Sequence, residues 1–528
     1  MPNKNILLIE PGYKNKYPPL GLMKIAAYHG PWGKNDKVRF IKGETDKTVF
    51  ETVWDRLYVT TLFSFEWNSI SNSIDFALAA SQNQPSKVFV GGIAASLMHE
   101  SFLEESRWRG VRFIKGLLSD PPATALQLDD FAEELYSDDR MGIPIEDLIP
   151  DYSILDHIKN QYVYPVHDAY FAYASRGCVR KCHFCGVPKL EGDQRDVTSI
   201  TSILRGIDER HGPKKDLTLM DNNIVASPNF KNIIAEIRDL GFTPGAHLNR
   251  PGCRPVQRRV DFNQGVDARI LCKNRMYLRE ISKICIDPLR IAFDHIGLRK
   301  PYETAIRYAH EFGLYDLSNY MLYNFHDSPS DLYHRMRLNI DLNEELGIRM
   351  FSFPMRYQPT NQKDRSHVGP NWNRYFLRSM QIILQATHGI VSGAPSFFKR
   401  AFGGSPEAFE SLLSRPDAFI FNRVWYEELG GKSEFVEFNV QFSKLTQGDR
   451  DELITLLSST KPSQFAGLTK KTKSKRVAKI LEFYLPLSED REQQIWALCR
   501  DHRSKQREPE ISVPEDQRVE DAGLTEAA

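Results

Sequence analysis

The sequence has few cysteines, almost no net charge and no long apolar run. Among its 528 residues are seven cysteines, and Lys plus Arg exceed Asp plus Glu by 69 − 68 = 1. So few cysteines argue against a disulfide-based fold. The charge balance excludes attraction of the whole surface to nucleic acid or membranes, although a local patch could still act.

Apolar runs are short throughout. None approaches the ~18 residues of a membrane span. The first run, residues 6–9, ends at Glu10 and Pro11, too early for a signal-peptide core. We therefore expect a cytoplasmic protein that does not contact a membrane.

Short apolar strands alternate with helical stretches over residues 1–140. The expected strands are residues 5–9, 57–61 and 87–92, and residues 71–80 are an expected helix. This alternation predicts an α/β domain with a Rossmann-like, doubly wound parallel sheet, whose ligands bind at the carboxyl ends of the strands. Gly12, Gly91 and Gly92 stand at those ends, where they leave room for a flat ligand or simply permit tight turns.

A second α/β region follows an irregular connector over residues 141–168. Residues 169–360 contain six strand candidates separated by helix-length segments, at 171–174, 217–220, 260–263, 290–293, 320–323 and 350–353. Six such units predict a partial (β/α)6 barrel of the TIM type. Polar residues follow each strand, and we expect them to meet at the mouth of the barrel.

The remaining chain is predicted to be mostly helical over residues 361–502, with a disordered tail over residues 503–528. A basic run precedes the tail and consists of Lys470, Lys471, Lys473, Lys475, Arg476 and Lys479. Most such runs are solvated helix faces, and contact with a polyanion is the alternative.

Three of the seven cysteines lie within eight residues, just after the first strand of the predicted barrel. Cys178, Cys182 and Cys185 form a C-x3-C-x2-C motif. Each thiolate can bind one iron of a cubane cluster, which leaves the fourth iron open to a substrate or cofactor. Phe184, between two of these ligands, can shield the cluster from water. The three cysteines are therefore the predicted metal ligands and catalytic residues.

Zinc is the alternative metal, because His183 could complete a Cys3His site. Adjacent Cys182 and His183 would bind one tetrahedral ion awkwardly, and the sequence has no second C-x2-C pair. A zinc-stabilised nucleic-acid-binding protein that uses the basic run is the corresponding alternative function, so nucleic acid stays open as a partner.

Cys178-x3-Cys182-x2-Cys185 at the start of six strand–helix units resembles the radical S-adenosylmethionine (SAM) superfamily. Pro18-Pro19-Leu20-Gly21-Leu22 and Val90-Gly91-Gly92 resemble the cobalamin (B12)-binding-type domain of one branch. That domain ligates cobalt through Asp-x-His-x-x-Gly, which Tyr28-His29-Gly30 does not satisfy. Cobalamin is therefore expected to bind without a histidine ligand, or the domain has lost it.

The resemblance implies a [4Fe–4S] cluster that binds SAM and cleaves it reductively, so that a 5′-deoxyadenosyl radical attacks an unidentified substrate. It implies an electron donor such as flavodoxin or ferredoxin. An RNA-modifying methyltransferase or methylthiotransferase of the same superfamily is an alternative. The methylthiolating enzymes usually carry additional N-terminal cysteines, whereas no cysteine precedes Cys178.

The candidate cofactor-binding residues all follow predicted strands. By position, the second strand end should bind the methionine amino group, although the family's Gly-Gly-Glu is absent. The third strand end offers polar groups for the ribose and an arginine for the carboxylate. The later strand ends could face cofactor or substrate, and for every candidate a salt bridge or cap is the structural alternative. The candidates are Asp221, Asn222, Asn223, Gln264, Asp267, Arg269, Asp294, Asn324 and Arg356.

Overall fold

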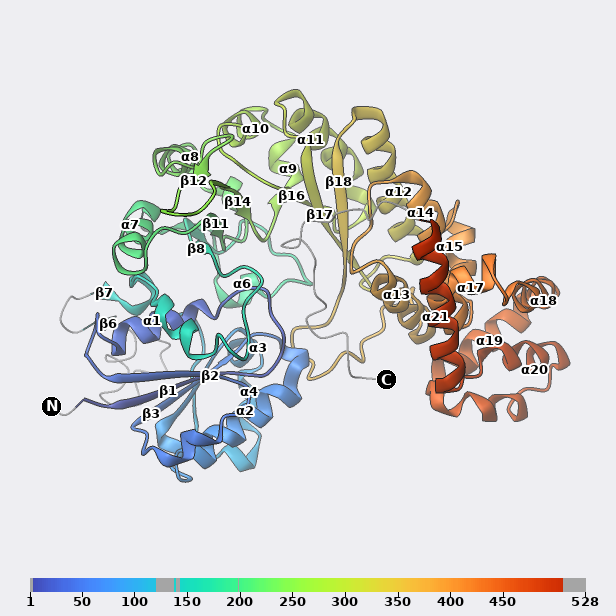
Figure 1. The fold of residues 1–528 in the computed structure, drawn as a ribbon, viewed down its shortest axis with the longest axis horizontal. Helices are drawn as coiled ribbons and strands as arrows, with labels where there is room; N and C mark the ends of the chain where they lie inside the picture. Colours follow the sequence, from blue (N-terminus) through green and yellow to red (C-terminus); the bar gives the residue numbers. More distant parts are fainter. Residues whose placement is uncertain (1–2, 120–136, 139–142, 198, 507–528) are drawn as a thin grey trace. The chain divides into compact units, whose positions relative to one another are not determined.

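The computed structural model describes residues 3–119, 137–138, 143–197 and 199–506 (Figure 1). The chain forms two compact units. The first contains Met1–Ala292, Lys300–Tyr320 and Tyr357–His367, and the second contains Phe293–Arg299, Met321–Arg356 and Val368–Ala528. The domain boundaries given above stay predictions. The predicted disordered tail lies, from residue 507 onward, outside the described residues, as do residues 141–142 of the predicted connector.

A five-stranded parallel sheet opens the first unit. Its strands are β1 (Asn5–Glu10), β2 (Lys37–Lys42), β3 (Arg56–Thr61), β4 (Val88–Gly92) and β5 (Arg112–Phe113), in the order β2-β1-β3-β4-β5. Leu7, Leu57 and Val88 are fully buried, as expected for strands covered on both faces. This is a doubly wound order, and its switch point for ligands lies between β1 and β3.

Helices alternate with these strands. They include α1 (Leu20–His29), α2 (Trp67–Ala80), α3 (Ile93–Leu97) and α4 (His99–Leu103). The prediction of a mixed α/β fold with parallel strands is confirmed.

A second parallel series follows in the first unit. The strands β8 (Ala169–Ala172), β11 (Asp216–Leu219) and β14 (Val260–Phe262) form one sheet in the order β14-β11-β8. Two more, β15 (Val266–Asp267) and β16 (Leu289–Ala292), continue in parallel to the start of β17 (Asp316–Tyr323). An isolated parallel bridge pairs Val260 of β14 with Ile286, which precedes β16 in the chain.

The helices α7 (Ile200–His211), α8 (Phe230–Asp239) and α11 (Arg299–Glu311) separate these strands along the chain (Figure 1). Each of the six predicted strands has an observed counterpart, the last being β18 (Arg349–Arg356) in the second unit. The short strand β15 was not predicted. Closure of the series into a barrel stays a prediction.

The second unit is mostly helical, as predicted. After β18 its α-helices are α13 (Arg374–Ala386), α14 (Pro395–Phe402), α15 (Pro406–Leu413), α16 (Asp417–Phe421), α17 (Arg423–Glu428), α18 (Lys432–Ser443), α19 (Gln447–Ser459), α20 (Lys475–Leu481) and α21 (Glu489–Gln506). Buried aromatic residues such as Phe419, Tyr426 and Phe438 form much of their core. In the described ranges, no helix combines the length and the apolar character that crossing a membrane requires.

Candidate functional site: the cysteine loop

The three motif cysteines lie in one loop, residues 177–194, which we call the cysteine loop. It begins after β9 (Ser175–Arg176) and ends before β10 (Arg195–Asp196), and these two short strands pair in antiparallel fashion. Gly177 adopts φ +74°, and a Cβ there would lie 2.1 Å from the carbonyl oxygen of Asp193. Only glycine fits this close approach, so the Gly-Cys pair of the motif has a steric cause.

None of the three motif cysteines forms a disulfide, and all three are partly exposed. The Arg180 N–H donates to Cys178 Sγ over 3.4 Å, and the Val187 N–H donates to Cys185 Sγ over 3.4 Å. Hydrogen bonds of this kind stabilise and tune the sulfur ligands of iron–sulfur clusters. Three reduced thiols in one loop, with backbone N–H groups already directed at two of them, fit the ligand set of such a cluster.

The zinc alternative gains no support. In the part of the chain that the structure describes, no three His, Cys, Asp or Glu side chains are grouped so that they could hold one metal ion. His183 is exposed. Thiolates that bind three different irons of a cubane do not have to meet around one ion, so the arrangement of the loop suits a cluster better than zinc.

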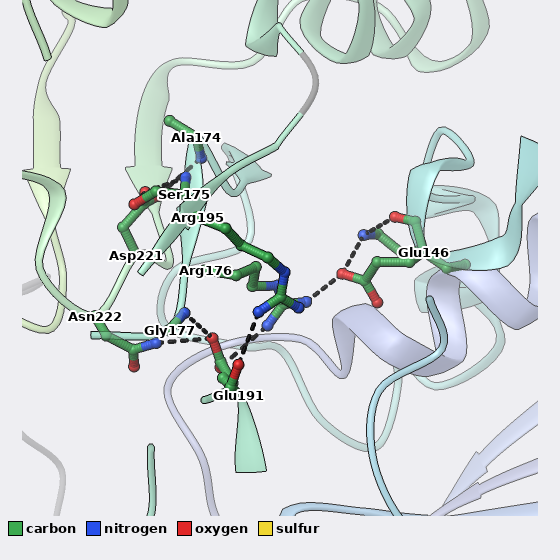
Figure 2. A network of polar contacts seen from close by, with 10 residues as sticks. Glu146, Ala174, Ser175, Arg176, Gly177, Glu191, Arg195, Asp221 and Asn222 are labelled. Atoms are coloured by element: carbon green, nitrogen blue, oxygen red, sulfur yellow. Dashed lines mark hydrogen bonds and ion pairs between the residues drawn. The ribbon is translucent and has the colours of Figure 1, made fainter. Parts of the chain in front are cut away.

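Glu191 ties the base of the cysteine loop to the end of β11 (Figure 2). Its carboxylate accepts hydrogen bonds from the Gly177 N–H (2.9 Å) and from Asn222 Nδ2 (2.9 Å), and it pairs with the Arg176 guanidinium at 3.2 Å. The Glu191 and Arg176 side chains are each 8% exposed. Asn222 therefore lies at the loop, and its assignment to the methionine amino group stays a prediction. Glu191 was not predicted.

Arg176 is held from a second side by Glu146 (Figure 2). Glu146 also pairs with Lys24 at 3.1 Å. Burial alone would raise the pKa of Glu146, but the positive charges of Lys24 and Arg176 outweigh it and lower that pKa. The guanidinium also stacks 3.3 Å from the ring centroid of Tyr173. The start of the cysteine loop is thus fixed by charged groups that are shielded from water.

Asp221 requires a correction. Its buried carboxylate accepts hydrogen bonds from the Ala174 N–H (3.0 Å) and from Ser175 Oγ (2.7 Å), as well as from the Ser175 N–H. Burial raises its pKa to about 6, against the effect of these hydrogen bonds. Because its oxygens hold the turn between β8 and β9, we no longer assign it to the methionine amino group.

Asp267 connects the cysteine loop to β15. Its carboxylate accepts from Arg180 Nε at 2.6 Å and from Arg269 Nε at 2.8 Å, and Asn223 Oδ1 accepts from its N–H at 3.4 Å. Burial would raise the pKa of Asp267, but the hydrogen bonds from Arg269 and Arg180 lower it. Three predicted residues, Asn223, Asp267 and Arg269, therefore meet beside the loop, and Arg180 joins them unpredicted.

Arg269 also lies beside Cys182. Burial would lower the pKa of Arg269, but the hydrogen bond and negative charge of Asp267 raise it, and Cys182 raises it to a smaller extent. The structure thus places positive charge next to one of the three thiols. Phe184 is half-buried in the same loop and Gln264 is exposed after β14, and neither residue's predicted role is tested.

The last three candidates lie in the second unit, and they are Asp294, Asn324 and Arg356. Asn324 is fully buried at φ +68°, and its side-chain oxygen accepts from the Gly369 N–H at 2.8 Å. That contact is structural, so we withdraw Asn324 as a ligand. The roles of Asp294 and Arg356 stay predictions. The fully buried Arg335 donates to the carbonyl oxygens of Phe293, Asp294 and Leu322 (2.8–3.1 Å). The sequence did not predict these contacts.

Packing within the protein explains one of the glycines at the edge of the N-terminal sheet. A Cβ on Gly92 would lie 2.4 Å from the Thr61 carbonyl oxygen, whereas one on Gly12 would make only an ordinary contact with Gly43 Cα at 3.6 Å. His29 is buried, with Nδ1 2.8 Å from Asp36 and Nε2 2.9 Å from the Tyr58 hydroxyl. Both ring nitrogens are therefore occupied, and His29 offers none to cobalt.

No protein-family model matches the sequence, and no curated protein does. Among solved structures the chain is similar to TsrM, a radical SAM methyltransferase from Kitasatospora setae with cobalamin and a [4Fe–4S] cluster bound, at 14% identity and TM-score 0.44, over 68% of this chain and 77% of that one. It is also similar to OxsB, a cobalamin-dependent SAM radical enzyme, at 13% identity and TM-score 0.46, over 96% of this chain and 80% of that one. HydG, a maturase of the [FeFe]-hydrogenase, matches at 14% identity and TM-score 0.30, over 83% and 97% of the two chains. Because these TM-scores lie below 0.5, we base the function on the residues of the site.

Proposed function

We propose that this protein is a radical SAM enzyme whose [4Fe–4S] cluster is held by Cys178, Cys182 and Cys185. The observation that carries this proposal is a single loop with three cysteines that form no disulfide, two of whose sulfurs accept hydrogen bonds from backbone N–H groups. When bound, such a cluster supplies the electron that cleaves SAM and so gives access to radical chemistry on unactivated C–H bonds.

The residues around the loop have distinct tasks in this proposal. Glu191 holds the backbone of Gly177 in place and thereby sets where Cys178 begins. Arg180 and Arg269 share the carboxylate of Asp267 and bring positive charge to the loop. A cluster with three thiolate ligands carries negative charge. The positive charge of Arg180 and Arg269 therefore stabilises the occupied site and favours the reduced form of the cluster.

Arg269 and Asn222 are the residues that we assign to SAM. The Arg269 side chain is 32% exposed. Asp267 accepts hydrogen bonds from the Nε and the backbone N–H of Arg269, and Cys182 forms a further side-chain hydrogen bond with the guanidinium. A guanidinium carries five N–H donors, so we assign those that remain to the carboxylate of SAM. Asn222 donates one amide hydrogen to Glu191 and keeps its carbonyl oxygen for an ammonium group. The substrate is the open part of this proposal.

Product analysis tests the proposal directly. Anaerobically reconstituted protein, reduced with dithionite in the presence of SAM, should release 5′-deoxyadenosine, which mass spectrometry detects. The variant with Cys178, Cys182 and Cys185 all replaced by Ala should release none. Cys253→Ala is the matched control, because Cys253 is an exposed cysteine outside the motif and should keep wild-type turnover. Equal 5′-deoxyadenosine from the triple variant would refute the proposal.

Cobalamin is proposed as a second cofactor on the sheet order alone, at the switch point between β1 and β3. Because both nitrogens of His29 are occupied, we expect binding without histidine ligation. Equilibrium dialysis with hydroxocobalamin should retain about one equivalent, and its spectrum should be the same in His29→Ala. Failure to retain hydroxocobalamin would remove this cofactor from the proposal without affecting the cluster.

A further inference from the structure

The helical second unit carries a segment with strong positive charge, although the whole chain has a net charge of only +1. Between Glu452 and Glu482 the sequence contains no acidic residue and seven basic ones. These are Lys461, Lys470, Lys471, Lys473, Lys475, Arg476 and Lys479. Such a concentration of one sign is a local feature and not a consequence of overall composition.

The fold turns these cations outward together. The segment contains the 3-10 helix η9 (Pro462–Lys470) and α20, whose apolar side chains, including Phe465, Leu468 and Val477, are buried in the helical core. All seven basic residues are exposed. Because burial of the apolar face fixes the orientation of both elements, the positive charges cannot turn inward.

The acidic residues of the neighbouring helix α19 leave most of this charge uncompensated. Asp449 pairs with Arg476 at 2.9 Å and accepts from Ser474 Oγ at 2.8 Å, while Glu452 accepts from Thr472 Oγ1 at 2.7 Å. Within the described ranges, none of the six lysines forms an ion pair with a side chain. The six lysines together form what we call the lysine surface.

The lysine surface lacks what a protein partner requires. Residues 461–481 expose no large apolar side chain. Protein interfaces are depleted in lysine, and their affinity comes from buried aromatic, aliphatic and arginine anchors. Exposed lysines that are concentrated in one segment without such anchors suit a partner that binds through regularly spaced negative charge, and nucleic-acid phosphates provide it.

We propose that the lysine surface binds the phosphate backbone of a nucleic acid without sequence preference. Lysine acts on phosphate as a point charge and reads no base edge. Nucleic-acid binding by the lysine surface does not depend on the iron–sulfur cluster, so an experiment can refute either proposal without affecting the other.

The test uses the full chain and a fluorescein-labelled, single-stranded RNA of 20 nucleotides, with binding followed by fluorescence anisotropy between 50 and 200 mM KCl. One phosphate contact for each of the six lysines, at about 0.7 each, gives a slope near −4.2 in log K against log salt, so the affinity should fall roughly 300-fold over this range. In Lys475→Gln/Lys479→Gln the slope should weaken by about 1.4.

Lys399→Gln/Lys432→Gln is the matched control. Both of these lysines are exposed in the second unit but lie outside the lysine surface, so the slope should stay that of the wild type. Absence of binding at 50 mM KCl would overturn the inference, as would equal slopes for the two double variants. Equally tight binding of poly-glutamate with the same number of charges would point to an acidic polypeptide and would also overturn it.

Discussion

Replacing Glu191 by Ala should release the cysteine loop. The substitution removes the acceptor of the Gly177 N–H, the Asn222 amide and the Arg176 guanidinium, all at a side chain that is only 8% exposed. Each hydrogen bond to a charged group contributes about 1.5–3 kcal/mol. Arg176 keeps its second partner, Glu146, so the loss does not reach the sum of the three. We expect the free energy that holds the loop closed to fall by about 3–5 kcal/mol, the range measured when one partner of a buried pair is removed.

Hydrogen exchange measured by mass spectrometry can detect this change locally. Since about 1.4 kcal/mol corresponds to a factor of ten, amides of residues 177–194 should exchange roughly 100- to 4000-fold faster in Glu191→Ala than in the wild type. Glu191→Gln keeps an acceptor oxygen and should show a smaller effect. Glu236→Ala is the control, because Glu236 binds Ser199 Oγ at 2.7 Å next to α7 and contacts no part of the loop described here. If loop exchange in Glu191→Ala stayed within twofold of the wild type, Glu191 would not be the clamp that we describe.

Three further predictions follow from the same contacts. Gly177→Ala should lower the iron content of reconstituted protein below half, because its Cβ would collide with the Asp193 carbonyl. Gly192→Ala is the control: it has the same positive φ (+75°) and so the same backbone strain, but open space around the added Cβ, and it should retain more iron; equal iron in both would contradict the steric argument. Arg269→Ala should weaken SAM binding about ten- to a hundred-fold by calorimetry while iron stays near normal, and an unchanged affinity would make Arg269 purely structural. Burial lowers the pKa of His29, although the hydrogen bond to Asp36 opposes this shift. As pH drops through about 6.5, His29 is therefore protonated in the unfolded chain before it is protonated in the folded one, and the free energy of unfolding falls. In His29→Gln the free energy of unfolding, measured in urea between pH 7 and 5, should depend less on pH, and an equal pH dependence in variant and wild type would refute this prediction.

The strands and the cysteine loop could be predicted because their causes are local. Runs such as Leu217-Thr218-Leu219 bury both faces of a strand, and three thiols within eight residues can only lie in one loop. Parallel pairing followed from the alternation with helices. Strand β2 was missed, and the two-residue strands β5 and β15 are too short to carry a detectable pattern.

The polar contacts could not be predicted because their partners are distant in the sequence. Asn222 meets Glu191 across 31 positions, and Asp221 meets Ser175 across 46. Nothing near Asp221 indicates that its oxygens are used by a turn of another strand, so it looked like a ligand. Arg180 was within reach of prediction, since it stands between two motif cysteines, but its partner Asp267 is 87 positions away.

Iron and acid-labile sulfide in the reconstituted protein test the central claim most directly. Protein reconstituted and desalted under anaerobic conditions should contain about four irons and about four sulfides per chain, and the triple replacement of Cys178, Cys182 and Cys185 by Ala should contain neither. Cys253→Ala should match the wild type. One equivalent of zinc without labile sulfide, or unchanged iron in the triple variant, would contradict the account.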